Sequence, residues 1–148
     1  MFQIVAPVKS LKGLRTLAGM GVRNFYGGLD VVNLSGRNTW KAGITDMDEL
    51  KQMTQYCDQN ALDFAYTLNI RPIGHTVSEL DTLYSDLKKA GVKNVILNDI
   101  LTIKKFEDIK VYVSSLAAIY DKNSLDFWSQ SHAVKRIILP RELTAEEK

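Results

Sequence analysis

The chain has 148 residues, 45% of them hydrophobic, which suits one domain with a single core over residues 1–148. With 19 basic and 17 acidic residues the net charge is +2, so charge does not indicate binding to nucleic acid. Cys57 is the only cysteine, so neither an intrachain disulfide nor a site built from several thiolates can form, and we expect neither metal nor cofactor in this chain. The single thiol and the lack of a signal segment or a long apolar run predict a cytoplasmic protein with no membrane partner.

The first part of the chain predicts a strand, a helix and a second strand. Phe2 to Val8 is a short apolar run, typical of a strand buried in a parallel sheet. Ser10 can cap a helix whose leucines recur at helical spacing and which ends near Gly21. The second strand, Val22 to Tyr26, is followed by Gly27-Gly28, a pair that permits close backbone approaches.

A polar loop from Leu29 to Gly43 separates this strand from a second helix. Thr45 or Asp46 can cap that helix. Its apolar stripe consists of Met47, Leu50, Met53 and Cys57. A position on a core face predicts a buried structural thiol for Cys57 rather than a reactive nucleophile, because apolar burial raises a thiol pKa.

The second part of the chain repeats the alternation. Further strands are predicted over Leu62 to Ile70, Asn94 to Leu97, Val111 to Val113 and Ile137 to Leu139. Between them we expect a helix opened by a Thr76/Glu79 capping box and ended by Gly91, a short helix around Leu101 to Phe106, and a helix capped by Asp121 or Asn123. After the last strand, Thr144 and Glu147 have the form of a capping box, so a sixth helix is expected to begin there.

Six successive βα units predict an α/β fold with a parallel sheet and right-handed crossovers. The alternation alone does not separate an open doubly wound sheet from part of a barrel. No Gly-x-Gly-x-x-Gly turn follows the first strand, and no Gly-x-x-x-x-Gly-Lys-Ser/Thr loop occurs. The two commonest nucleotide-binding forms of such a sheet therefore lose support.

Polar side chains gather where the predicted strands end. In both parallel architectures, binding sites lie at the carboxyl ends of the strands. Here the strand exits carry Lys9, Tyr26, Asn69, Asn98, Asp99, Ser114, Ser115, Arg141 and Glu142, whereas the strand bodies are almost wholly apolar. We expect the functional site at this edge; for any one residue, the alternative is an ordinary loop or capping role.

Two of these positions have competing interpretations. Arg141 and Glu142 either form an ion pair on the rim, or Arg141 binds a carboxylate or phosphate while Glu142 orients it or moves a proton. Asp99 is either a helix cap or a base beside Asn69 and Asn98.

Histidine chemistry has weaker support. His75 lies near a strand exit, where a solvated position is the alternative to contact with a ligand. A serine nucleophile at Ser114 or Ser115 would need His75 as its base, which requires their loops to converge. Two isolated histidines without a His-Glu-x-x-His motif make a weak metal site, so no metal ligands are predicted.

Several short motifs occur in an order that points to a known family. They are Ala6-Pro7, Tyr26-Gly27-Gly28, Thr67-Leu68-Asn69, Asp99, Ser114 and the stretch from Arg136 to Glu147. Over nearly the whole chain, this series resembles the amino-terminal domain of the peptidase U32 family, the collagenase-like proteases. In that family a hydrophobic strand runs into Ala-Arg-Glu-Leu-Ser, which here is Pro140-Arg141-Glu142-Leu143-Thr144. The family's usual Ser-Thr-Gln is replaced by Ser114-Ser115-Leu116, which removes an amide that could bind substrate.

The resemblance implies a TIM-barrel-like fold with about six of the βα units present, so we expect a U32-type domain over 1–148, truncated before the last barrel units. It implies a peptidase acting on a peptide or small-molecule substrate, with Asp99 and Glu142 as catalytic residues. The expected substrate-binding residues are Tyr26, Gly27, Gly28, Asn69, Ser114 and Arg141.

Two alternatives to a peptidase stay open. Some relatives take part in oxygen-independent hydroxylation of RNA bases or of the ubiquinone ring, with an iron-sulfur cluster held by cysteines further along the chain. The other alternative is a non-catalytic subunit, in which open sheet edges pair with a partner chain or with a second copy.

Overall fold

The computed structural model describes residues 3–29, 43–69, 77–106, 108–144 and 146, and the structural statements below concern these residues. The strands are β1 (Val5–Pro7), β2 (Asn24–Gly27), β3 (Asp63–Leu68), β4 (Asn94–Leu97), β5 (Lys110–Val113) and β6 (Val134–Ile137). The helices are α1 (Leu11–Gly19), α2 (Met47–Gln59), α3 (Val77–Lys89), α4 (Ile100–Lys105) and α5 (Lys122–Ser129), with a 3-10 turn η1 (Ser115–Ala117).

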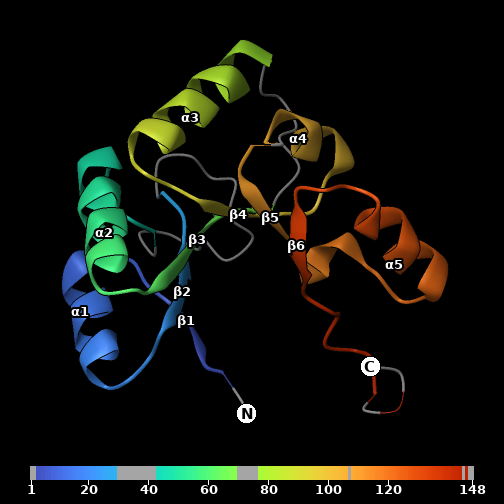
Figure 1. Ribbon diagram of the computed structural model, residues 1–148, viewed down its shortest axis with the longest axis horizontal. Coiled ribbons are helices and arrows are strands. Elements are labelled where there is room, and N and C mark those ends of the chain that lie inside the picture. Colours follow the sequence, from blue (N-terminus) through green and yellow to red (C-terminus); the bar gives the residue numbers. More distant parts are fainter. Residues whose placement is uncertain (1–2, 30–42, 70–76, 107, 145, 147–148) are drawn as a thin grey trace.

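All six strands are parallel and lie side by side in chain order, from β1 to β6. A doubly wound sheet would reverse its strand order at a switch point, whereas consecutive order with right-handed crossovers places every helix on one side. Figure 1 shows the helices around the convex outside of a curved sheet, with both chain ends at its open side. The predicted α/β fold is confirmed as an open, TIM-barrel-like sheet, in which the described residues form five βα units followed by a sixth strand.

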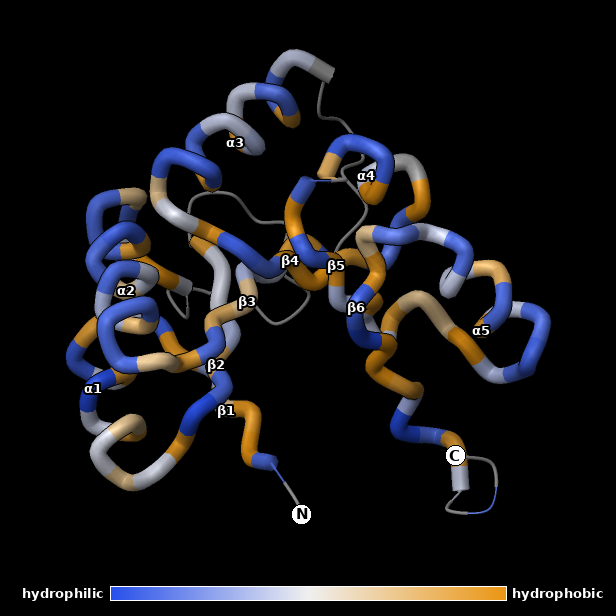
Figure 2. Tube along the Cα trace, in the orientation of Figure 1, coloured by the Kyte–Doolittle hydropathy of each residue, from blue (hydrophilic) through white to orange (hydrophobic). Residues whose placement is uncertain are grey.

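The main core lies between this sheet and its helices. Alternate strand residues face the helices, among them Phe25, Tyr66, Val95 and Val111, which are at most 1% exposed. The phenol oxygen of Tyr66 accepts a hydrogen bond from the backbone N–H of Leu29 at 3.2 Å, so its polar atom is satisfied within the core. Figure 2 shows helices with mixed hydrophilic and hydrophobic segments, as expected for elements that cover a sheet on one side.

The predicted helix signals are confirmed where the structure describes them. Ser10, Asp46 and Asp121 each accept a hydrogen bond from the backbone N–H three residues further on, at 3.1, 2.8 and 2.9 Å. Gly21 and Gly91 follow α1 and α3 with φ of 94° and 79°, the left-handed conformation that favours glycine. The longest helices, α2 and α3, have 13 residues, and no helix within the described ranges is long and apolar enough to cross a membrane.

The sixth strand differs from the prediction. The apolar run Ile137 to Leu139 suggested a buried strand, but β6 begins at Val134 and its side chains are half-buried or exposed. Among the described strands it pairs only with β5, and a register shift at Val111/Tyr112 accompanies the pairing. An edge strand has one neighbour, so its side chains need not be apolar on both faces.

Several predictions fall outside the described residues. They include most of the Leu29 to Gly43 loop, the loop from Arg71 to His75, Thr76 of one capping box and Glu147 of the other. In the described part of the C-terminal stretch, Arg141 and Glu142 lie in a turn.

Candidate functional site

The concave side of the sheet contains a hollow of about 560 Å³. Side chains that alternate with those of the main core point into it. Its floor is a separate apolar cluster of Ala65, Ile96 and Tyr112, against which Tyr26 packs. The described polar residues that line the hollow are Tyr26, Asp63, Thr67, Asn69, Tyr112, Ser114, Ser115, Arg136 and Arg141.

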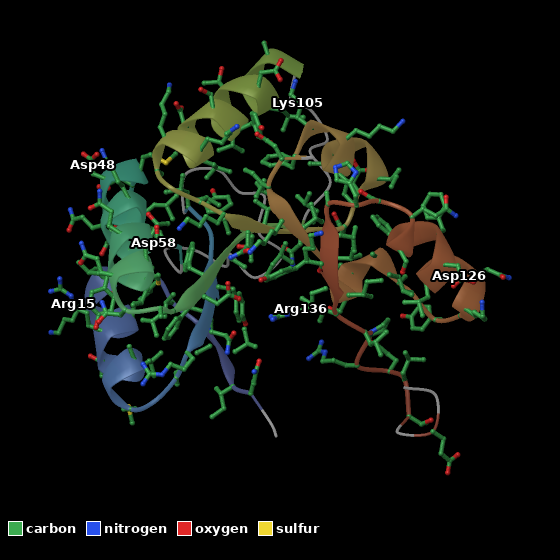
Figure 3. The ribbon with its side chains drawn as sticks, viewed as in Figure 1. Arg15, Asp48, Asp58, Lys105, Asp126 and Arg136 are labelled. Atoms are coloured by element: carbon green, nitrogen blue, oxygen red, sulfur yellow. The ribbon has the colours of Figure 1, made fainter. Side chains whose placement is uncertain are left out.

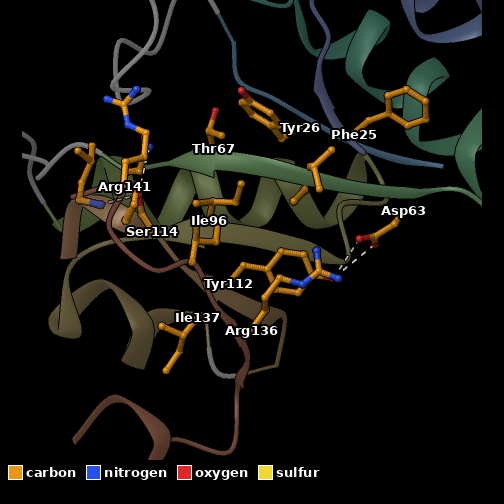
Figure 4. Close-up of a pocket in the computed structure, with 16 residues that line it drawn as sticks. Phe25, Tyr26, Asp63, Thr67, Ile96, Tyr112, Ser114, Arg136, Ile137 and Arg141 are labelled. Carbon is orange, nitrogen blue, oxygen red and sulfur yellow. Dashed lines mark hydrogen bonds between the residues drawn. The ribbon is translucent and has the colours of Figure 1, made fainter. Parts of the chain in front are cut away.

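Four of the six predicted substrate-binding residues meet in this hollow, namely Tyr26, Asn69, Ser114 and Arg141. The amide nitrogen of Asn69 donates to the hydroxyl oxygen of Ser114 at 3.4 Å, which joins the exits of β3 and β5. Ser114 is 3% exposed. Its hydroxyl oxygen also accepts a hydrogen bond from the backbone N–H of Leu116 at 3.2 Å, which caps η1. Figure 4 shows Ser114 and Arg141 close together at one end of the hollow.

Arg141 is exposed and forms no ion pair with any described residue, Glu142 included. The rim ion pair is therefore not what the structure contains. A guanidinium carries five N–H donors in a planar fork, and Arg141 lines the hollow without a described carboxylate as its partner. Glu142 is also exposed, and it does not line the hollow. Its catalytic role stays a prediction.

Asp99 has the geometry of a helix cap. Its carboxylate accepts hydrogen bonds from the backbone N–H of Thr102 at 3.0 Å and from the Thr102 hydroxyl at 2.7 Å, at the start of α4. These contacts are those of the capping alternative. Asp99 does not line the hollow, and its catalytic role stays a prediction. Beside it, Asn98 has a buried amide oxygen with no hydrogen-bond partner among the described residues.

The glycine pair after β2 shapes the strand exit and does not line the hollow. A Cβ atom on Gly27 would lie 2.4 Å from the backbone oxygen of Val8, so only glycine allows β1 and β2 to approach this closely. The carbonyl oxygen of Gly28 accepts a hydrogen bond from the backbone N–H of Ile44 at 2.8 Å. A substrate-binding role for either glycine stays a prediction.

Sequence reasoning missed a polar cluster at the other end of the hollow. Asp63 accepts a hydrogen bond from the Asn94 amide at 2.8 Å and one from the Tyr112 hydroxyl at 3.2 Å. The guanidinium carbon of Arg136 lies 4.5 Å from the centre of the Tyr112 ring, a cation-π contact. Strand alternation could have predicted the position of Asp63. It lies six residues before Asn69 on β3 and its exit, and residues an even number apart on a strand share a face.

Burial and charge act on the titratable groups near the sheet. Desolvation, and after it the negative charge of Asp63, raise the pKa of Tyr112, which keeps its hydroxyl protonated as a donor. Cys57 is 2% exposed, and burial together with nearby Asp58 raises its thiol pKa to about 12. The prediction of a buried thiol at Cys57 is confirmed.

The described residues do not fit an iron-sulfur cluster. No group of three or more His, Cys, Asp or Glu among them is placed to hold a metal ion, and Cys57 packs in the core on the helix side. Cluster chemistry of the hydroxylation branch would need ligands other than these.

Comparison with known proteins agrees with the fold. A collagenase from Porphyromonas gingivalis (strain W83) is 22% identical over 148 residues, which are 99% of this chain and 34% of that protein, so the chain spans about a third of its length. The solved structure of the U32 peptidase Mk0906 matches with a TM-score of 0.63 at 16% identity, over 84% of this chain and 53% of that one. The sequence model of Peptidase family U32 matches residues 9–147. The chain therefore belongs to peptidase family U32.

Proposed function

We propose that this chain carries the substrate-binding face of a U32-type peptidase and that an extended peptide lies in the inner-face hollow. The observation that carries the proposal is the position of Arg141, which lines the same hollow as Asn69 and Ser114 and has no described carboxylate paired to it. Membership of the family supports the hydrolytic assignment. The single buried thiol of Cys57 suits the cytoplasm, which is the compartment we propose.

In this proposal the polar end of the hollow positions the peptide. The planar fork of Arg141 binds a carboxylate of the substrate through charge-assisted hydrogen bonds. The Ser114 hydroxyl accepts two hydrogen bonds and still has its own proton to donate to a peptide carbonyl. The apolar floor contacts the peptide side chains.

Hydrolysis adds water across the amide bond. The water oxygen bonds to the carbonyl carbon, the C–N bond breaks, and the departing nitrogen takes a proton. We assign Glu142, which follows Arg141 in the same turn, as the general base that takes a proton from that water and then gives it to the departing nitrogen. Asp99, the second predicted catalytic carboxylate, caps α4, and a direct step for it in this hydrolysis stays a prediction.

The proposal is tested by incubating the chain with denatured collagen in ¹⁸O-labelled water and analysing the products by mass spectrometry. We expect new carboxyl termini that contain ¹⁸O, and at least tenfold slower cleavage by Arg141→Gln. Lys135→Gln is the matched control, because it removes an exposed cation from the neighbouring β6 and should cleave at the normal rate. Absence of cleavage, or equal rates for Arg141→Gln and the unchanged chain, would count against the proposal.

A second candidate is a non-catalytic subunit, which the open sheet edges favour. Val5 of β1 and Ile138, directly after β6, are 48% and 37% exposed and line the hollow from its two borders. Unpaired strand edges with apolar side chains tend to associate with another chain. Sedimentation equilibrium decides this point: a stable oligomer supports the second candidate, and a monomer at high concentration contradicts pairing between copies.

A further inference from the structure

At the end of the hollow that lies farther from Ser114, Arg136 contacts a tyrosine ring that hydrogen bonds hold in place. Asn94 and Tyr112 both donate hydrogen bonds to Asp63, which fixes the phenol ring in place. The guanidinium of Arg136 stacks on that ring at 4.5 Å. Figure 3 shows Arg136 at the open centre of the molecule, whereas Arg15 and Asp126 extend outward from helices. A stacked guanidinium keeps its N–H donors available at the ring's edge.

Arg136 has no carboxylate partner among the described residues. No described residue forms an ion pair with it, and the carboxylate of Asp63 is already occupied by Asn94 and Tyr112. Among the described residues, two arginines and one aspartate line the hollow, so the charges of these three side chains sum to a net positive charge. An apolar floor with two cations favours a ligand that brings negative charge to more than one point.

The two arginines mark opposite ends of one path along the sheet. Figure 4 shows Arg141 beside Ser114 and Arg136 beside Tyr112. Tyr112 and Ser114 are two residues apart on β5 and its exit, which is a separation of about 7 Å along a strand. Alternate residues of an extended peptide have the same spacing of about 7 Å. A peptide that lies along β5 can therefore match its alternate side chains to Tyr112 and Ser114, with one arginine beside each (Figure 4).

We propose that Arg136 is a second carboxylate-binding residue of the hollow and that it selects peptides with an acidic side chain. The proposal rests on the peptide-binding function proposed above and deepens it, because it names the class of peptide. Arg141 holds one polar group of the peptide, and Arg136 holds a glutamate or aspartate elsewhere in the same peptide.

The first arm of the test follows the Arg136 side-chain Nε signal by NMR during separate titrations with glutarate and inorganic phosphate. Glutarate should shift that signal, and Lys135→Gln should leave the shift intact. No shift with glutarate, or a shift with phosphate alone, overturns a carboxylate site. This arm needs no peptide, so it separates the site from the proposed function.

The second arm compares the blocked peptides acetyl-Ala-Glu-Ala-Ala and acetyl-Ala-Gln-Ala-Ala by isothermal titration calorimetry. The Glu peptide should bind at least tenfold more tightly than the Gln peptide. Arg136→Gln should abolish that preference without weakening the Gln peptide, and Arg136→Lys, which keeps the charge but not the planar fork, should retain part of it. Lys135→Gln should retain all of it.

The outcomes distinguish the two proposals. Equal affinity for both peptides, or a preference that survives in a folded Arg136→Gln variant, overturns the role of Arg136 and leaves the peptide-binding function standing. A glutarate shift at Arg136 without binding of either peptide supports the carboxylate site and contradicts the peptide-binding function.

Discussion

Replacing Gly27 by alanine is expected to destabilise the sheet at the junction of β1 and β2. The new Cβ would lie 2.4 Å from the backbone oxygen of Val8, well inside ordinary van der Waals contact. That oxygen cannot swing away, because the N–H of Val8 donates to the Tyr26 carbonyl at 2.9 Å and holds the two chains together. The strands must separate locally, and forced overpacking of this kind costs about 1–3 kcal/mol.

Urea unfolding followed by circular dichroism measures this effect. With a denaturant slope of about 1–3 kcal/mol per molar, a loss of 2 kcal/mol lowers the midpoint by about 1 M. Gly19→Ala is the matched control: a Cβ there has nothing within 4 Å, and the position ends α1, so stability should be unchanged or slightly higher. Equal midpoints for the two variants would refute the close-approach argument. A stable Gly27→Ala variant that no longer binds peptide would instead support the predicted substrate contact.

Two further predictions concern capping and pH. Asp99→Ala should lower the free energy of unfolding by about 1 kcal/mol through loss of the α4 cap, whereas Asp99→Asn should keep most of it, because an amide oxygen also caps; equal losses in urea unfolding would contradict the capping role. Burial raises the pKa values of Cys57 and Tyr66 from 9.0 and 10.0 to about 12. The unfolded chain therefore releases these protons first, so stability is full below pH 9 and falls as pH rises toward 12. A urea midpoint that is the same at pH 8 and pH 10.5 would contradict this account.

The helical elements were predictable because their signals are local. Ser10, Asp46 and Asp121 precede apolar residues at helical spacing, and each caps a helix as expected. Gly21 and Gly91 follow helices in the left-handed conformation. The alternation of elements also predicted a parallel sheet, although only the observed pairing of strands in chain order distinguishes a barrel-like sheet from a doubly wound one.

The inner face was not predictable by the same reasoning. Asn69, Ser114 and Arg141 follow strands, where a site in a parallel sheet is expected. Asp63 lies at the start of β3 and Arg136 within β6, so their places in the sequence give no such signal. Which face of a strand meets the helices depends on register and tertiary packing, which sequence spacing alone does not define. The same limit explains why β6 was expected to be buried and begins earlier than its apolar run.

We propose that substrate binds the concave face of the sheet and not the helix-covered surface. An NMR map of backbone amide shifts during titration with peptides from denatured collagen tests it directly. We predict that the largest changes fall on Asn69, Ser114 and Arg141, with smaller changes at Tyr112 and none on the outer faces of α2 and α3. Changes confined to those helices, or no changes at saturating peptide, would contradict the claim.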